Sequence, residues 1–145
     1  LALAGVGSKE PELNALAKTL NINKRVHFLG LVDNMPEFYQ SLDVFCLPSR
    51  HEGFPLSPLE AQACGVPVVL TQTGASHEAL CPTTGKIVPI NDSNALAFAL
   101  RAQLIHADHK EAKIRNEQSP GRQFVIQFAA LTHTLAAYQQ LKTNR

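Results

Sequence analysis

The sequence carries almost no excess of charge of either sign. Its 145 residues include 13 Lys and Arg against 12 Asp and Glu, so the formal net charge is +1 at pH 7. Proteins that bind nucleic acid or an acidic membrane surface through a general electrostatic field need a much larger basic excess. We therefore predict no nucleic-acid partner.

Cysteine and histidine patterns that hold metals or disulfides are also lacking. The cysteines Cys46, Cys64 and Cys81 are odd in number and form no CxxC pair. Two of them lie in apolar surroundings, which indicates buried thiols in a reducing compartment. The six histidines show no HxxxH or His/Cys spacing. We expect neither a metal nor a cofactor.

Long apolar runs and targeting segments are absent as well. No apolar stretch approaches the about 20 residues that a membrane-spanning helix needs, and nothing resembles a signal peptide. We expect a cytoplasmic protein, with peripheral attachment at the inner face of the membrane as an alternative for the full-length protein. The chain opens within the apolar run LALAGV, without an initiator methionine, which is typical of a fragment.

What the sequence does contain is a regular alternation of two patterns. A hydrophobic share of 45% is ordinary for a globular protein, and this length suits one domain, residues 1–145. Short apolar runs alternate with stretches of helical periodicity, which predicts a Rossmann-like α/β fold, a parallel sheet with helices on both faces. The expected strands are residues 1–6, 26–29, 43–47, 68–70 and 86–90.

Capping and turn residues mark the helices between these strands. The apolar positions Leu13, Leu16, Ala17 and Leu20 follow the 3.6-residue period of a first helix. Gly5 and Gly7 form only a partial GxG, which favours a tight turn over a dinucleotide site. Pro89 suggests that the last strand lies at a sheet edge. The expected helix starts are Ser8, Asp33 or Asn34, Ser57, Thr73 or Ser76, and Asp92 or Ser93.

A final helix is expected over residues 122–141, after the break at Pro120-Gly121. We predict that its apolar seam packs on the domain, and an oligomer interface or a membrane contact is the alternative. The seam consists of Phe124, Phe128, Leu131, Leu135 and Tyr138.

The chain is organised around residues 47–71, LPSRHEGFPLSPLEAQACGVPVVLT. This stretch contains a strand end, a loop, a short helix and a second strand. Glu52 lies in the loop, while Ser57 and Glu60 fit a capping box at the helix start. Strand carboxyl ends and helix N-termini both attract anionic ligands. From the residues alone, the capping box is a sufficient reason for Glu60, whereas Glu52 caps nothing obvious and fits a solvated surface acid and a ligand-binding role equally well.

Seven residues separate Glu52 from Glu60, and this E-x7-E pattern within PSRHEGFPLSPLEAQACGVPVV resembles the signature of retaining family 4 glycosyltransferases. RVHFLGLVDNMPEFYQSLDVFCLPS and TGKIVPINDSNALAFAL also match the C-terminal domain of that family, so the resemblance covers essentially the whole chain. It implies the GT-B fold, two Rossmann-like domains facing across a cleft. This chain would be part of the C-terminal, donor-binding domain.

The resemblance also implies roles for individual residues. Glu52 would be catalytic and face the donor sugar, where its charge would stabilise an oxocarbenium-like transition state without forming a covalent bond. Glu60 would accept hydrogen bonds from the ribose hydroxyls. Gly74 resembles a loop glycine of the family, whereas Ala75 stands where a second glycine is common. The remaining predicted substrate-binding positions are Val32, near the nucleobase, and Gly53, Phe54, Leu56 and Ser57.

The implied substrates are a nucleotide-diphosphate sugar and a saccharide or lipid-linked acceptor in polysaccharide biosynthesis, with no metal. The resemblance further implies an N-terminal domain and a first strand-helix unit, whose arginine and lysine grip the diphosphate, outside this sequence. We therefore expect no transferase activity from these 145 residues alone. The alternatives are a non-catalytic nucleotide-sugar or protein binding module derived from such an enzyme, and a sugar-nucleotide epimerase.

Overall fold

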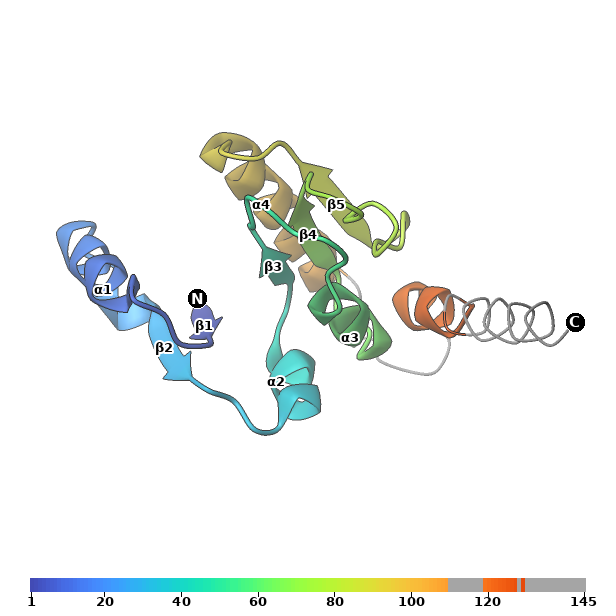
Figure 1. Ribbon diagram of the computed structural model, residues 1–145, viewed down its shortest axis with the longest axis horizontal. Coiled ribbons are helices and arrows are strands. Elements are labelled where there is room, and N and C mark those ends of the chain that lie inside the picture. The colour runs from blue at the N-terminus through green and yellow to red at the C-terminus, as the bar shows by residue number, and fades with distance from the viewer. Residues whose placement is uncertain (110–118, 128, 130–145) are drawn as a thin grey trace, which may run out of the picture. The chain divides into compact units, whose positions relative to one another are not determined.

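The computed structural model describes residues 1–109, 119–127 and 129. The chain divides into two units, Leu1–Phe38 and Tyr39–Arg145, which we call unit 1 and unit 2. Each unit has its own sheet, with two strands in unit 1 and three in unit 2, and every strand pair is parallel (Figure 1).

Unit 1 has a β-α-β arrangement. Strands β1 and β2 pair with Ala2 opposite His27. Gly5 has a φ of +112° and donates its N–H to the carbonyl of Gly30 at 2.6 Å, so this glycine serves the turn that leaves β1. The elements are strand β1 (Ala2–Ala4), helix α1 (Glu10–Thr19), the 3₁₀ turn η1 (Asn23–Arg25) and strand β2 (His27–Gly30).

The cap expected for α1 is wrong, and most of its apolar positions are exposed. The residue at its N-cap is Lys9 rather than Ser8, and no side chain caps the helix. Leu13, Leu16 and Leu20 are 43%, 52% and 57% exposed, and Ala17 is the buried residue of α1. The helical period was correct, but a two-stranded sheet offers too narrow a face to cover a full apolar stripe.

Unit 2 contains the larger sheet, in the order β3-β4-β5. Helix α2 (Met35–Ser41) spans the boundary between the units in sequence. The position of β5 at the edge agrees with the prediction from Pro89. The elements that follow α2 are strand β3 (Phe45–Leu47), helix α3 (Ser57–Ala63), strands β4 (Val68–Thr71) and β5 (Gly85–Val88), and helix α4 (Ser93–His109).

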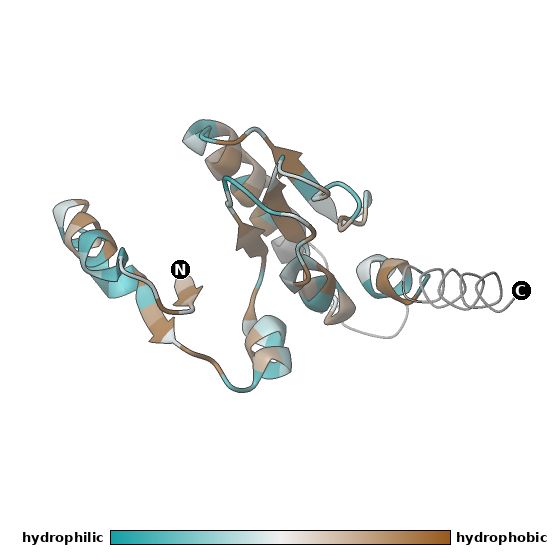
Figure 2. Ribbon diagram, in the orientation of Figure 1, coloured by the Kyte–Doolittle hydropathy of each residue, from teal (hydrophilic) through white to brown (hydrophobic). Residues whose placement is uncertain are grey.

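The core of unit 2 is built around the central strand β4, whose four residues are all buried. Val69 packs with Val88 of β5 and Ala99 of α4. Because side chains alternate along a strand, Val68 and Leu70 point to the opposite face. Both faces are therefore covered, as in buried parallel sheets generally. Strands β3 and β4 are correspondingly drawn in the brown of hydrophobic residues in Figure 2.

Local capping rules hold at three helix ends. Asn34 Oδ1 accepts from the N–H of Glu37 at 3.3 Å, and Asp92 Oδ1 accepts from Ala95 at 2.8 Å. Gly65, with a φ of +75°, ends α3. The N–H groups of Gly65 and Val66 bond the carbonyls of Gln62 and Ala61, which is the Schellman pattern.

The helix expected from Thr73 or Ser76 to Leu80 is wrong. Residues 74–79 form successive turns instead. Ser76 Oγ accepts from the N–H of Thr73 at 3.1 Å, so the hydroxyl closes a turn rather than starting a helix.

At the other end, residues 120–127 are helical, and Gly121 is buried. A Cβ at Gly121 would lie 3.2 Å from the carbonyl oxygen of Gln62, so this point of the chain packs on α3. Most of the predicted seam, from Phe128 to Tyr138, lies outside the described residues. The 122–141 helix and the single domain over residues 1–145 stay predictions.

Candidate functional site

The loop that carries Glu52 leaves the carboxyl end of β3 and is tied to the end of β4. Thr71 Oγ1 donates to the carbonyl oxygen of Ser49 at 2.5 Å. Ser49 Oγ in turn donates to Glu52 Oε1 at 2.7 Å. This chain of two hydroxyls fixes one oxygen of the Glu52 carboxylate relative to the sheet.

A second loop, between β4 and β5, supports the backbone of the first. Ala75 donates its N–H to the carbonyl oxygen of Gly53 at 3.0 Å. Gly74 has a φ of +43°, and a Cβ there would overlap the carbonyl oxygen of Glu52 and lie 2.7 Å from that of Gly53. Glycine at position 74 is therefore required both for its backbone conformation and for this close approach.

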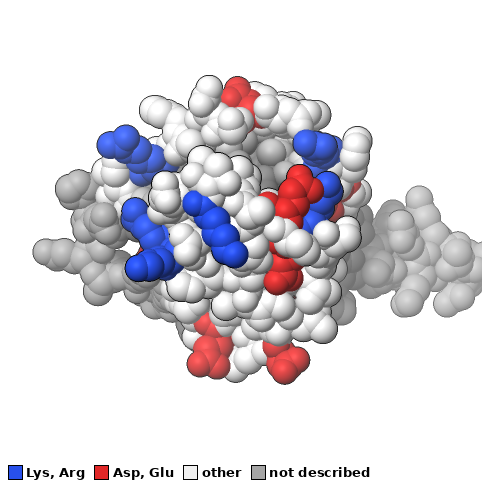
Figure 3. All heavy atoms as spheres, turned by 90° about the vertical axis from the view of Figure 1, so that its left-hand side faces the viewer, with Lys and Arg blue, Asp and Glu red and all other residues white. Residues whose placement is uncertain are grey.

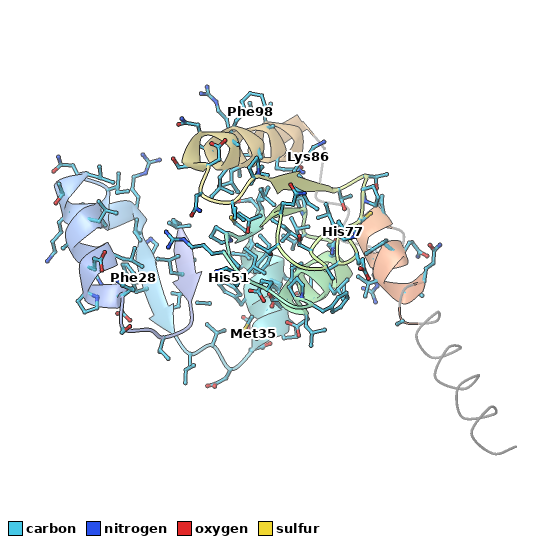
Figure 4. All side chains as sticks on the ribbon, turned by 45° about the horizontal axis from the view of Figure 1, so that its top comes forward. Phe28, Met35, His51, His77, Lys86 and Phe98 are labelled. Atoms are coloured by element: carbon cyan, nitrogen blue, oxygen red, sulfur yellow. The ribbon has the colours of Figure 1, made fainter. Side chains whose placement is uncertain are left out.

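These loops enclose an open hollow of about 530 Å³ beyond the carboxyl ends of the strands. Ligands of open α/β sheets bind at this edge. The exposed His51 belongs to its wall, and Figure 4 labels it in the loop after β3. The lining residues are Arg50, His51, Glu52, Gly53, Gln72, Thr73, Gly74 and Ile90.

The sequence analysis found part of this wall and missed the rest. Glu52 and Gly53 were predicted as ligand-binding residues, and Gly74 was noted. Arg50, Gln72, Thr73 and Ile90 were not proposed for any site. Arg50, Gln72 and Thr73 follow two expected strands and Ile90 ends a third, which was a usable signal because parallel strands end at a common edge. Arg50 gives this wall a positive charge.

Glu60 is not part of a capping box, which corrects the structural interpretation of this residue. Helix α3 begins at Ser57, its N-cap is Leu56, and no side chain caps it. The Glu60 carboxylate instead accepts a hydrogen bond from the hydroxyl of Tyr39, with Oη and Oε2 2.7 Å apart. Burial first, and then the Glu60 carboxylate, raise the pKa of Tyr39 well above its ordinary value.

Helix α3 is held in place by a buried glutamine. Gln62 Nε2 donates to the carbonyl oxygens of Pro58 at 2.9 Å and Ala79 at 2.8 Å. Gln62 Oε1 accepts from the N–H of Cys81 at 2.7 Å. Gln62 therefore joins α3 to the segment that leads into β5, and the glutamine is fully buried.

The other predicted substrate-binding residues of unit 2 lie outside the wall of the hollow. Phe54 and Leu56 are 38% and 63% exposed, and Ser57 is half-buried. None of these three lines the hollow, nor does Glu60. Val32 belongs to unit 1 and is described separately from the others. The roles given to all seven residues stay predictions.

Outside this hollow, the described residues include charged side chains of both signs and three free thiols. The face drawn in Figure 3 carries basic and acidic side chains together. No group of three or more His, Cys, Asp or Glu in the described part of the chain could hold a metal. Burial raises the pKa of the Cys46 thiol. Burial also raises that of Cys81, but hydrogen bonds with Thr83 and Thr84 outweigh it, and the pKa of Cys81 is lowered.

Within the ranges that the structure describes, no helix has the length and apolar character to cross a bilayer. Phe98 is 77% exposed and extends outward from α4 (Figure 4).

Comparison with known proteins identifies relatives over most of the chain. The sequence model of the family described as glycosyl transferases group 1 matches residues 1–106. The lipopolysaccharide core biosynthesis mannosyltransferase LpsB of Rhizobium meliloti is 41% identical over 96 residues, 64% of this chain and 27% of that protein. D-inositol 3-phosphate glycosyltransferase of Salinispora tropica is 36% identical over 83% of this chain and 26% of its own length.

Solved structures agree with these sequence matches. Sucrose-phosphate synthase from Thermosynechococcus elongatus is 28% identical with a TM-score of 0.78, over 100% of this chain and 39% of that one. Anabaena Alr3699/HepE in complex with UDP is 25% identical with a TM-score of 0.79, over 98% and 40%. The parallel α/β fold resembles GT-B structures, as predicted, and the chain spans about a quarter of the length of those two curated relatives.

Proposed function

The chain belongs to the glycosyl transferases group 1 family, and we propose that it forms the donor-binding part of a retaining glycosyltransferase that uses a nucleotide-diphosphate sugar. The observation that carries this proposal is the hollow at the strand ends, with Glu52 in its wall. Ser49 fixes the Glu52 carboxylate from one side and the Gly74 loop supports its backbone. Such preorganisation is what electrostatic catalysis requires.

Glu52 would act on the donor sugar by charge. As the bond to the diphosphate breaks, positive charge develops at the anomeric carbon, and a fixed carboxylate nearby stabilises it. The leaving diphosphate is anionic, and the Arg50 side chain in the same wall would offer it a cation. Attack by the acceptor on the same face of the sugar would then give retention without a covalent enzyme intermediate.

Glu60 would bind the nucleotide rather than the sugar. It lies outside the wall of the hollow, in the first turn of α3, and is exposed. A carboxylate there would accept hydrogen bonds from the two ribose hydroxyls. The related protein solved with UDP supports a nucleotide donor, and the related lipopolysaccharide mannosyltransferase supports glycan biosynthesis.

The acceptor would be a saccharide or a lipid-linked sugar, with the reaction at the cytoplasmic side of the membrane. No metal would be needed, because Arg50 and the arginine and lysine expected outside this sequence would balance the charge of the diphosphate. The N-terminal domain of the full-length protein would supply the acceptor site.

Ligand-observed NMR of the chain with UDP, GDP, ADP and their sugar conjugates tests donor binding directly. We expect one nucleotide to bind, Glu60→Ala to abolish its binding, and Glu52→Ala to remove only the preference for the sugar conjugate. Glu12→Ala changes an exposed carboxylate in unit 1 and serves as the control. If the wild-type chain binds none of these nucleotides at millimolar concentration, these 145 residues do not form a donor site by themselves, and the affinity would rest on the arginine and lysine expected outside this sequence.

A further inference from the structure

Each of the two glutamates at residues 52 and 60 is held on one side by a hydroxyl of unit 2. Ser49 Oγ donates to Glu52 Oε1 and Tyr39 Oη donates to Glu60 Oε2, both at 2.7 Å. Among the described residues, Glu60 Oε1 accepts no hydrogen bond. The Glu60 carboxylate therefore presents one anchored oxygen and one open oxygen.

The anchor on Glu60 is rigid. The Tyr39 side chain is 2% exposed, and its ring packs edge-on against Phe45, with centroids 5.6 Å apart and planes at 74°. A ring held in this way fixes the position of its hydroxyl. Glu60 is exposed, and the last torsion of a glutamate is broad, so an unanchored carboxylate would sample many orientations. The hydrogen bond selects one of them before any ligand arrives.

Space filling alone does not account for the hydroxyl. Phenylalanine would fill nearly the same volume beside Phe45, and most buried side-chain hydroxyls bond the backbone or water. Tyr39 instead reaches the carboxylate of a residue 21 positions along the chain, in the first turn of α3. Because burial and then Glu60 raise the pKa of Tyr39, this hydroxyl remains a proton donor throughout the neutral range.

We propose that Tyr39 is a positioning residue for donor recognition: its hydroxyl holds Oε2 of Glu60 so that Oε1 faces the cis-hydroxyls of the nucleotide ribose. This inference rests on the proposed function of Glu60. Tyr39 itself does not touch the nucleotide. Its contribution is the orientation of the carboxylate, so it affects ligands only through their ribose hydroxyls.

The test compares each of UDP, GDP and ADP with its 2′,3′-dideoxy form, which lacks the hydroxyls. Tyr39→Phe should weaken binding of the ribonucleotide about three- to tenfold, the range of one oriented hydrogen bond, and leave the dideoxy form unchanged. In a Glu60→Ala background the same substitution should have no effect, because no carboxylate remains to be oriented. Thr19→Val deletes a hydroxyl that bonds the Ala15 carbonyl in α1 and is the matched control.

Each outcome decides the matter. If Tyr39→Phe weakens binding of both nucleotide forms equally, Tyr39 only supports the fold. If it leaves the ribonucleotide affinity unchanged, the hydrogen bond to Glu60 does not contribute to binding. Either result overturns the inference while donor binding stands. A wild-type chain that binds the two forms equally shows that Glu60 does not recognise ribose, and overturns its proposed function together with the inference.

The hydrogen bond between Tyr39 and Glu60 can also be tested without a ligand. In tyrosine-labelled protein at neutral pH, the ¹³Cζ resonance of Tyr39 should shift on Glu60→Ala, because the phenol loses its charged hydrogen-bond acceptor. An unchanged resonance would show that the hydroxyl and the carboxylate do not interact in solution, and would overturn the inference independently of nucleotide binding.

Discussion

The glutamine at position 62 offers a sharp test of how α3 is held against the sheet. Its amide bonds the carbonyl oxygens of Pro58 and Ala79 and the N–H of Cys81, at 2.7 to 2.9 Å. Gln62→Leu preserves much of the side-chain volume and removes all three bonds. The Ala79 carbonyl and the Cys81 amide then lose these partners inside a dry environment.

The expected loss follows from what those two groups leave behind. Each buried backbone group without a partner costs about 1–3 kcal/mol, so two cost about 2–6 kcal/mol. The more apolar leucine recovers roughly 1–2 kcal/mol of burial. The difference is centred at about 2.5 kcal/mol, so we expect Gln62→Leu to lower the free energy of unfolding by about 1–4 kcal/mol. At a denaturant dependence of about 1.5 kcal/mol per molar urea, the midpoint falls by about 1–3 M.

Urea denaturation followed by circular dichroism measures the change, and hydrogen exchange at Cys81 locates it. Gln40→Leu makes the same chemical change at an exposed position of α2 and should stay within about 0.5 kcal/mol of the wild type. If Gln62→Leu were as stable as Gln40→Leu, the three bonds would contribute nothing, and the account of α3 as tied to the segment before β5 would be wrong.

Three further substitutions test other parts of unit 2. Gly74→Ala should lower the free energy of unfolding by about 1–3 kcal/mol, measured with urea, because its Cβ would overlap the Glu52 carbonyl oxygen. A Cβ at Gly7 would lie in open space, so Gly7→Ala should not destabilise the chain, and equal effects of the two substitutions would contradict this reasoning. Ser49→Ala should lower the turnover number of the full-length enzyme about tenfold by releasing Glu52, with nucleotide affinity unchanged; unaltered turnover would count against it. The raised pKa of Tyr39 also predicts a pH dependence. Above about pH 10 the Tyr39 phenol ionises more readily in the unfolded chain than in the folded one, so the free energy of unfolding falls by up to about 1.4 kcal/mol per pH unit. This slope, measured from urea midpoints, should be shallower in Tyr39→Phe, and identical slopes would refute it.

Features that depend on neighbours in sequence could be predicted. Asn34 and Asp92 cap the helices they were expected to cap, and Gly65 ends α3, because each acts on backbone within three or four residues. Ser57 and Glu60 also fit a local rule, the capping box, but α3 has no side-chain cap. The Glu60 carboxylate bonds Tyr39, and no local pattern reports a partner 21 residues away.

The candidate site was likewise predicted only where it depends on neighbours in sequence. Glu52 and Gly53 were found because the motif around them is contiguous in sequence. Gln72, Thr73 and Ile90 come from two later loops, and only the parallel pairing of β3, β4 and β5 brings them to the same hollow. The exposure of Leu13 could not be predicted either, since periodicity shows which face of a helix is apolar and not whether anything covers it.

The main-chain bond between Ala75 and Gly53 has a practical consequence for spectroscopy. Any residue except proline can donate that N–H, so this hydrogen bond does not restrict the partly buried side chain at position 75, whereas the close approach at Gly74 requires glycine. A fluorescent or ¹⁹F-labelled side chain installed at position 75 would therefore sit beside the Glu52 loop without breaking the bond that supports it. Such a label would report, in real time, how the loop responds as a donor sugar arrives and leaves.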